Sequence, residues 1–306
     1  NLSNTIILVI YMGLGFSRNI YGLRNSALRS IKKSIPLFYQ LLILIGAVFK
    51  FLYNTNKKKK FETFSENLDE INEFEYKKTS QNNEDGIIEY LLQKLELSNI
   101  NFVEIGFDYF QNNSLNIIKK TKKGLFVDGS VEKVFLLKYI TKFFYPMKNI
   151  EVINVMIHKD NINEIISKKF DAEDEIDFLS IDIDGVDYYV FENLKFKPKI
   201  VCIEYNFWYG KEVKCSVPYS EKFEWNMESF YSGASLKALC SLANSKDYHL
   251  IALDSSCVNA FFVRGDLRYL FKVLDSEKSF KVPLRYTKDK INNEKNKLLK
   301  RPLVYF

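Results

Sequence analysis

The chain has 306 residues, of which 47% are hydrophobic and 27% charged. This composition excludes a disordered protein, and its 12 glycines and 6 prolines exclude a collagen-like or proline-rich one. The net charge of +6 is uneven, because residues 1–60 hold ten Lys or Arg and no acid, whereas the rest holds 34 basic and 38 acidic residues. The main part of the chain therefore lacks the net positive charge that is typical of a nucleic-acid-binding domain, and we expect no nucleic-acid partner.

Residues 1–60 form an apolar and basic N-terminal segment. Apolar runs occupy Thr5–Phe16 and Ile35–Tyr53, with basic clusters between and after them. The second run has 19 residues, close to the roughly 20 that span a bilayer, but it contains Gln40 and Lys50. The pattern favours a segment that lies on a membrane surface or crosses the membrane once. The alternative is a pair of apolar helices packed on the main domain or on a partner.

After residue 60 the composition changes, and from residue 81 the predicted secondary structure changes as well. Residues 61–80 are polar and acidic and predict a linker, and from residue 81 short β-rich runs alternate with helical stretches. The predicted strands are Asn101–Ile105, Gly124–Asp128, Ile150–Ile157, Ile176–Asp182, Lys199–Glu204, His249–Leu253 and Ala260–Val263. The predicted helices are Ser130–Phe143, Asn161–Lys169, Val186–Leu194 and Ser235–Ser245.

This alternation is typical of an α/β fold with a doubly wound, mostly parallel sheet. We expect this domain to cover residues 81–265, with an aromatic insertion at 205–232 and a C-terminal extension at 266–306. In the first predicted helix, one buried face is expected from a single set of apolar residues: Phe135, Leu136, Tyr139, Phe143 and Phe144.

Ligands of open parallel sheets bind beyond the carboxyl ends of the strands, so the residues at those ends are the first candidates. The first predicted strand ends in Glu104 and Gly106, and the second ends in Asp128 and Gly129. Glycine permits close approach of the backbone, and an acid after the second strand suits the hydroxyls of a ribose. Together these residues favour a nucleoside cofactor.

The fourth predicted strand ends in the densest group of acids. Asp182, Asp184 and Asp187 lie within six residues, and the fifth strand brings Glu204 and Asn206 beside them. Carboxylates at this density need a proton, a cation or hydrogen-bond donors to compensate them. The group predicts a general base, a site for Mg²⁺ or another divalent cation, or both. The alternative is that Asp187 caps the following helix and the other residues hold loops.

His158 is one of only two histidines and follows the third predicted strand. Two interpretations of it remain open. It borders the base of the nucleoside, with Asn161 nearby, or it is a surface residue of a loop.

Several of these residues occur in motifs whose order along the chain resembles a known family. The motifs are Ser80–Ile87, Phe102–Gly106, the pair Asn112 and Asn113, Val127–Ser130, Ser180–Asp187, Ile203–Asn206, Val217–Tyr219, Gly233–Leu236 and Asn259–Val263. Between about Ser80 and Arg264, the chain is similar to the FkbM-like S-adenosylmethionine-dependent methyltransferases. The loop at 106–110 departs from the family pattern, because Phe107 and its neighbours replace further glycines, and Asn83 stands where the opening motif has Gly.

The resemblance implies a Rossmann-like, seven-stranded methyltransferase sheet and S-adenosylmethionine as the cofactor. The cofactor-binding residues that it implies are Glu84, Glu104, Gly106, Asp128 and Gly129. The catalytic residues are Asp182, Asp184 and Glu204, the first two of which are also the candidate metal ligands. The residues expected to bind the acceptor are Asp187, Asn206 and Trp208, the last by stacking on a sugar; packing over the sheet edge is its alternative role.

The implied reaction is methyl transfer to a hydroxyl, on a sugar of a glycolipid or polysaccharide. The cofactor is made in the cytosol, so the site is expected at the cytoplasmic face of a membrane, held there by residues 1–60. Two alternatives remain. One is a catalytically degenerate, membrane-tethered binding protein, suggested by the altered loop at 106–110. The other is a nucleotide-sugar glycosyltransferase that uses Asp182-Ile183-Asp184.

Overall fold

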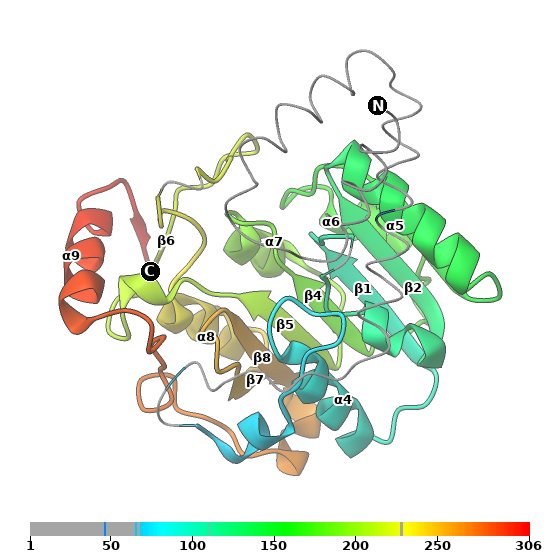
Figure 1. Cartoon of the computed structure of the whole chain (residues 1–306), viewed down its shortest axis with the longest axis horizontal. Helices are drawn as coiled ribbons and strands as arrows, with labels where there is room; N and C mark the ends of the chain where they lie inside the picture. Colours follow the sequence, from blue (N-terminus) through cyan, green and yellow to red (C-terminus); the bar gives the residue numbers. More distant parts are fainter. Residues whose placement is uncertain (1–45, 47–64, 66–67, 110, 227–228) are drawn as a thin grey trace, which may run out of the picture.

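A computed structural model describes residues 46, 65, 68–109, 111–226 and 229–306 of the chain (Figure 1). The predictions for residues 1–60 therefore lie almost wholly outside the described residues. Within those ranges no helix is long and apolar enough to cross a membrane.

The centre of the molecule is a seven-stranded sheet with the strand order β3-β2-β1-β4-β5-β8-β7 (Figure 1). Its strands are β1 (Ile100–Ile105), β2 (Thr121–Asp128), β3 (Asn149–Asn154), β4 (Phe178–Ile181), β5 (Ile200–Glu204), β7 (Tyr248–Leu253) and β8 (Asn259–Arg264). The first five run parallel, and β8 is antiparallel to both of its neighbours. This confirms the predicted doubly wound, mostly parallel sheet.

β8 is antiparallel to β7 because the connection between the two strands is short. Only residues 254–258 join β7 to β8, and so short a link can form a hairpin but not the crossover that a parallel pair needs. The order of the strands reverses between β1 and β4, since the chain winds outward through β2 and β3 and then returns to begin the other half at β4. The two carboxyl ends at this reversal mark the expected ligand site.

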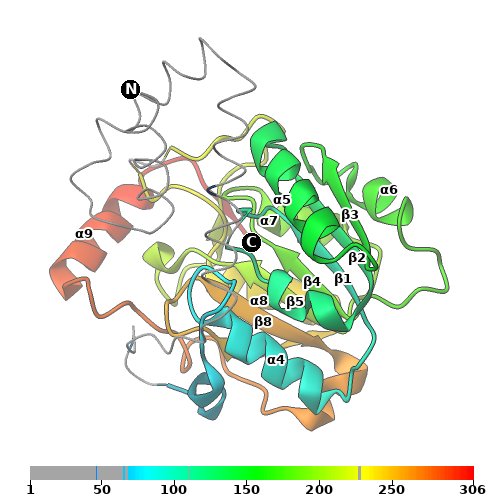
Figure 2. The same ribbon diagram turned by 45° about the vertical axis from the view of Figure 1, so that its right-hand side comes forward.

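Helices cover both faces of the sheet (Figures 1 and 2). The helices are α4 (Glu84–Lys94), α5 (Val131–Phe144), α6 (Ile162–Ser167), α7 (Asp187–Asn193) and α8 (Leu236–Ser245), with shorter 3-10 helices η2 (Glu70–Phe74), η3 (Leu115–Lys120) and η5 (Gly265–Leu270). Alternate residues of β1 point to opposite faces: Val103 and Ile105 join the core under α6, α7 and α8, and Ile100 and Phe102 join the core under α4 and α5.

The buried face of α5 differs from the prediction. Its buried residues are Val134, Leu136, Leu137, Ile140 and Thr141. Tyr139 and Phe143, which were expected inside, are exposed. The sheet beneath selects a stripe of the helix about one residue away from the aromatic one, and this choice belongs to the tertiary packing.

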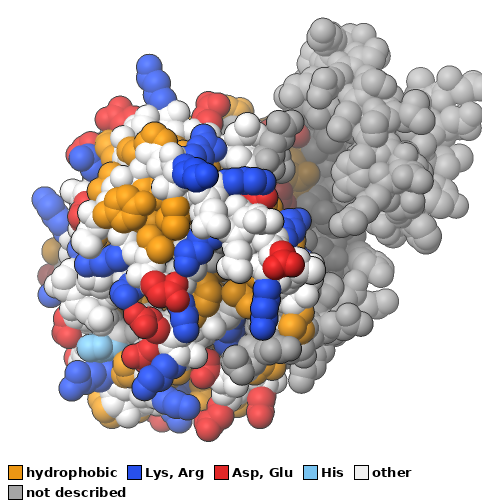
Figure 3. Space-filling model, turned by 90° about the vertical axis from the view of Figure 1, so that its left-hand side faces the viewer, with side chains coloured by type: hydrophobic (Ala, Val, Ile, Leu, Met, Phe, Trp, Pro, Cys, Tyr) orange, Lys and Arg blue, Asp and Glu red, His pale blue; other side chains and the backbone are white. Residues whose placement is uncertain are grey.

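Segments before and after the predicted domain pack against it. In the described part of the predicted linker, Ile71, Asn72 and Glu75 are buried around η2. At the other end of the chain, α9 (Lys288–Leu298) contacts η4 (Phe207–Tyr209), and β9 (Val304–Tyr305) pairs with β6 (Cys215–Ser216) of the insertion. Figure 3 shows the molecule from the side of α9, where a patch of hydrophobic side chains lies among Lys and Arg.

Candidate functional site

A cleft of about 190 Å³ lies at the carboxyl ends of β1, β2 and β4, where the strand order reverses. Its lining comes from the ends of these strands, from the segment after β3 and from the insertion. The lining residues are Gly106, Val127, Asp128, Gly129, Ser130, Lys133, Val155, Met156, Ile157, Asp182, Ile183, Asp184, Val186, Ser220, Glu221 and Phe223. The cleft therefore contains Gly106, Asp128, Gly129, Asp182 and Asp184 of the residues predicted from sequence.

Gly106 lets the first loop cross closely over β4. Its φ is +74°, a region that favours glycine, and a Cβ here would lie 1.7 Å from the carbonyl oxygen of Asp182. Its N–H donates to the carbonyl oxygen of Val127 at 2.8 Å. Glycine is required here by the close packing of the loop against the end of β4.

The bulky residue that follows Gly106 does not fill the cleft. The Phe107 side chain is buried in the core under α4 and α5, where its ring meets that of Phe126 edge to face at 5.6 Å. Its N–H donates to Oδ2 of Asp128 at 3.2 Å. The departure from the family pattern at Phe107 thus leaves the cleft open.

Asp128 lies at the tip of β2 on the cleft wall. Its carboxylate accepts hydrogen bonds from the N–H of Phe107 and, at 2.6 Å, from the N–H of Ser130. The Lys133 ammonium lies 3.5 Å from Oδ2. These contacts hold the carboxylate at the position where ribose hydroxyls are expected in folds of this type.

Glu104 lies below the cleft and does not line it. Its two carboxylate oxygens accept the N–H groups of Asn113 and Ser114 at 2.7 Å each. Burial raises the pKa of Glu104 to about 7, against the lowering effect of these hydrogen bonds. Glu104 holds the returning end of the first loop, and its contact with a cofactor remains a prediction.

Asp182, Asp184 and Glu204 form the carboxylate cluster of the site. One oxygen from each lies within 4.8 Å of the others. Burial, followed by the charges of the neighbouring carboxylates, raises the pKa of Asp182 and of Glu204 well above the ordinary values. The contact between the two carboxyl groups adds to the rise in the pKa of Glu204. Asp184, in the left-handed region with φ 59°, is more exposed, and partial burial raises its pKa less.

Asp187 holds the turn before α7, whereas the alternative interpretation expected it to cap that helix. Its carboxylate oxygens accept the N–H groups of Ile183 and Gly185 at 2.8 and 2.9 Å. The residue is buried, and burial raises its pKa to about 6 despite these bonds. It shapes the turn that carries Asp184 and offers no free oxygen to an acceptor.

Two residues predicted to bind an acceptor instead stabilise the insertion. Asn206 donates to the carbonyl oxygens of Phe230 and Ser232 and accepts the N–H of Trp208. The Trp208 ring is buried and stacks on Phe230 at 4.0 Å, with Tyr286 at 4.8 Å. The prediction that Trp208 stacks on a sugar is wrong in this structure, because other aromatic rings cover it.

Glu84, the remaining cofactor candidate, is fully buried at the start of α4. Its carboxylate accepts from the backbone and side chain of Asn82 and from the side chain of Asn259. It joins α4 to the start of β8 and does not line the cleft. The structure corrects its predicted role: the oxygens that a cofactor would need already hold two parts of the fold together.

Sequence reasoning missed Lys133, Met156 and three residues of the insertion that line the cleft, Ser220, Glu221 and Phe223. The Phe223 ring packs on Gly185, where a Cβ would lie 2.2 Å from it. Lys133 was within reach of sequence analysis, since it lies one turn into the helix that follows Asp128. The insertion residues gave no such signal, because only the tertiary fold brings their loop over the cleft.

The residues present fit the reacting part of a nucleoside cofactor. Asp128 suits a ribose, and Gly106 and Gly129 keep the backbone side of the cleft free of side chains. The volume of about 190 Å³ is below the roughly 300–1,000 Å³ typical of ligand pockets. The loop that carries Ser220–Phe223 contributes to the lining, so its position limits the space for a cofactor.

Comparisons with known proteins gave one family model and a set of structural matches. A model described as cytochrome c oxidase subunit VIc matches residues 21–80, most of which lie outside the described part of the chain. No curated protein matches the chain.

Among solved structures, the chain is similar to a S-adenosylmethionine-dependent methyltransferase from Clostridium acetobutylicum, with 11% identity over 60% of this chain and 90% of that chain and a TM-score of 0.38. It is similar to magnesium protoporphyrin IX methyltransferase from Synechocystis PCC 6803 with bound SAM (8% identity, 59% and 77% covered, TM-score 0.36). A third similar structure is TrmK from M. capricolum in complex with S-adenosyl-homocysteine (17% identity, 66% of this chain and 73% of that chain covered, TM-score 0.34).

The strand order itself defines the class: a seven-stranded, Rossmann-like methyltransferase sheet with one antiparallel strand between β5 and β7. At these identities and TM-scores, the matches carry no argument about the class or the activity.

Proposed function

We propose that this chain is a S-adenosylmethionine-dependent O-methyltransferase that acts on a hydroxyl of a sugar in a glycolipid or polysaccharide. One observation carries the proposal. The cleft at the reversal of the strand order has the ribose candidate Asp128 on one wall and the carboxylates of Asp182 and Asp184 on another. A nucleoside and a base for an acceptor hydroxyl thus have places in the same cleft.

The chemistry of the carboxylate cluster supports a transfer to oxygen. When bound, the cofactor would supply an electrophilic methyl group. A sugar hydroxyl is a weak nucleophile at neutral pH and needs a base. Asp182 would accept its proton, and the raised pKa of Asp182 makes its ionised form a stronger base than an ordinary carboxylate.

Glu204 would supply the neighbouring carboxyl that shares the proton with Asp182. Asp184, at the exposed edge of the cluster, would orient the acceptor. A divalent cation held by Asp182, Asp184 and Glu204 is the other way to activate a hydroxyl, since all three offer oxygen ligands within 4.8 Å.

The choice of acceptor rests on the N-terminal segment. Residues 1–60 are apolar and carry ten basic residues and no acid, which suits attachment to an anionic membrane surface. Attachment at the cytoplasmic face would bring the cleft close to lipid-linked sugars and to the cytosolic cofactor. A variant that lacks residues 1–60 is expected to leave the membrane fraction, and unchanged fractionation would remove this part of the proposal.

The cofactor site is tested by calorimetric titration of the full chain with S-adenosylmethionine and S-adenosylhomocysteine. Asp128→Ala is expected to weaken binding at least tenfold, because it removes the carboxylate that would hold the ribose. Asp171→Asn is the matched control, since Asp171 is exposed and does not line the cleft.

The titration also separates the alternatives. No binding by a folded wild-type chain would favour a degenerate binding protein. Binding of a nucleotide sugar with Mn²⁺, and not of either methyl-transfer ligand, would favour a glycosyltransferase that uses Asp182 and Asp184.

A further inference from the structure

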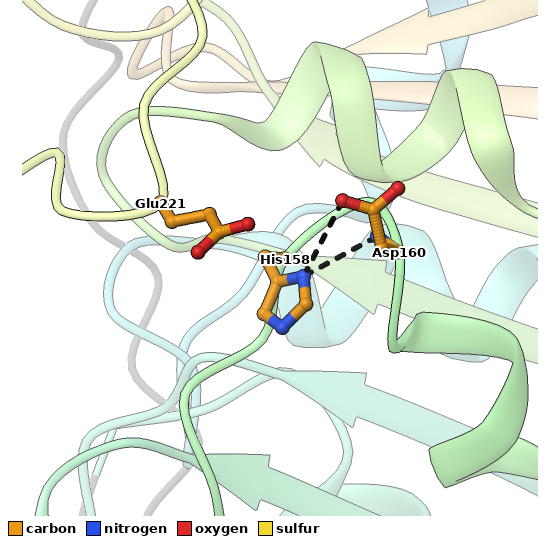
Figure 4. Close-up of side chains that lie close together, drawn as sticks. All are labelled: His158, Asp160 and Glu221. Atoms are coloured by element: carbon orange, nitrogen blue, oxygen red, sulfur yellow. Dashed lines mark hydrogen bonds and ion pairs between the residues drawn. The ribbon is translucent and has the colours of Figure 1, made fainter.

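A second group of metal-ligating side chains lies at the rim of the cleft and plays no part in the proposed reaction. It consists of His158 and Asp160, in the segment between β3 and α6, and Glu221, in the insertion (Figure 4). One nitrogen or oxygen of each lies within 4.8 Å of those of the other two. Two loops that are about 60 residues apart in the sequence thus place three ligand atoms at one point.

The three side chains face one another. Nδ1 of His158 accepts the N–H of Asp160 at 3.3 Å and lies 3.8 Å from Oδ2 of the same residue. Figure 4 shows the imidazole ring between the two carboxylates, with that of Glu221 approaching from the other loop. Asp160 and Glu221 are exposed and His158 is half-buried, so the group is open to ions from solvent.

The charge of the group is not compensated by the surrounding side chains. Within the described ranges, no Lys or Arg forms an ion pair with Asp160 or Glu221. Lys159, which lies between His158 and Asp160 in the sequence, is placed over the ring of Tyr219, 4.4 Å from its centre. Two carboxylates and an imidazole therefore lie close together, and neither carboxylate has an ion-pair partner among the Lys and Arg that the structure describes.

We propose that His158, Asp160 and Glu221 bind a divalent transition-metal ion, of the class of Zn²⁺, Co²⁺ or Mn²⁺. An imidazole with two carboxylates suits these ions, whereas Mg²⁺ and Ca²⁺ prefer oxygen ligands alone. Three protein ligands leave a fourth position for water, as in zinc sites that are not purely structural. The site is distinct from the all-oxygen cluster of Asp182, Asp184 and Glu204.

Small movements of exposed side chains complete the geometry. Ligand atoms around a tetrahedral ion at about 2.0–2.1 Å lie roughly 3.3–3.5 Å apart. The present spacing of up to 4.8 Å closes to this range through rotation of Asp160 and Glu221, which solvent leaves free to move.

Bound metal would join the insertion to the segment after β3. Glu221 lines the cleft, and the neighbouring Phe223 packs on Gly185 beside the carboxylate cluster. The ion would thus fix the position of the loop that carries Ser220–Phe223, which limits the space for a cofactor. This consequence rests on the proposed function, whereas the metal site itself does not.

The experiment is calorimetric titration of the full chain with Zn²⁺, together with the visible absorption spectrum of the Co²⁺-loaded chain. We expect one equivalent of Zn²⁺ to bind and the Co²⁺ spectrum to show a nitrogen ligand in a low-coordinate site. His158→Gln and Glu221→Gln should each weaken Zn²⁺ binding at least tenfold and reduce the Co²⁺ bands.

Two controls locate the metal. His249→Gln changes the other histidine of the chain, and Asp182→Asn changes the all-oxygen cluster; both should keep the Zn²⁺ equivalent. Absence of Zn²⁺ binding by the wild type, or binding that His158→Gln and Glu221→Gln leave unchanged, would overturn the inference. Neither readout uses S-adenosylmethionine, so failure of the proposed function would not be mistaken for failure of the metal site.

Discussion

The carboxyl edge of the sheet has two halves, and acidic residues have different surroundings in each. At the ends of β1, β2 and β4, carboxylates line an open cleft. Beyond β8 and β7, the edge is closed by η2 and the segment that follows it, where the buried Glu75 is held by hydrogen bonds.

The closed half shows how a buried acid is stabilised. The Glu75 carboxylate accepts from the side chain of Asn72 at 2.7 Å and from the backbone and hydroxyl of Ser255 at 2.7 and 2.5 Å. The fully buried Lys281 donates to Asn72 and lies 3.3 Å from the carboxylate of Asp69. Hydrogen-bond donors here satisfy the buried polar groups and hold η2 and the segment after it against the sheet.

In the open half, the carboxylates of Asp182 and Glu204 accept no backbone N–H from any residue that the structure describes, and burial and the neighbouring carboxylates raise the pKa of both well above the ordinary values. Asp182 and Glu204 are thus chemically available, whereas hydrogen bonds within the fold hold Asp187 and Glu84. These four acids differ in this way although all of them lie in motifs of the same resemblance.

The largest expected effect is on activity. Asp182→Asn removes the base and should lower the rate of S-adenosylhomocysteine formation with carbohydrate acceptors by about 100-fold or more, within the range for loss of a general base. Circular dichroism should show an unchanged fold. Asp171→Asn serves as the control, and full activity of Asp182→Asn would remove the catalytic assignment.

In the closed half, the effect should fall on stability. Glu75→Ala leaves the N–H of Ser255 and the amide of Asn72 without their acceptor. We expect it to lower the free energy of unfolding by about 3–4 kcal/mol in urea denaturation, as for the loss of a buried, hydrogen-bonded charge. The exposed neighbour Glu73→Ala should change stability by less than about 0.5 kcal/mol. Equal effects of the two variants would contradict the distinction between the halves.

Glu104 gives the expected pH dependence. Burial raises its pKa from 4.5 to about 7, so the folded chain binds this proton more tightly than the unfolded chain. The contribution is complete below about pH 4.5 and is lost as pH rises through about 7, which amounts to about 2.5 kcal/mol between pH 5 and 8. Glu104→Gln should lack this loss. The free energy of unfolding of the variant should therefore rise relative to that of the wild type as pH increases. A constant difference would show that Glu104 titrates normally.

The smallest effect compares two helix caps. The hydroxyls of Ser130 and Ser235 accept the N–H of Lys133 and of Ala238 at 3.4 and 3.2 Å. Each change to Ala should cost about 1 kcal/mol in thermal unfolding. Only Ser130 lines the cleft, so only Ser130→Ala should change the affinity for S-adenosylmethionine. Loss of affinity in both variants would mean that destabilisation alone closes the site.

The sequence by itself determined the sheet. Short apolar runs predicted the seven strands, and each predicted run overlaps an observed strand, because burial on both faces of a sheet favours apolar residues along its central strands. It also placed Gly106, Asp128, Asp182 and Asp184 at strand ends, and these ends meet in one cleft.

Only the tertiary structure decided which acids are free and what covers the cleft. Glu84 accepts from the side chain of Asn259, 175 residues away, and no local pattern reveals so distant a pair. Trp208 has the composition of a stacking residue, yet Phe230 and Tyr286 bury it. Hydrogen bonds and ring contacts between segments far apart in the sequence depend on the folded path of the chain, and that path gives chemically similar residues different roles.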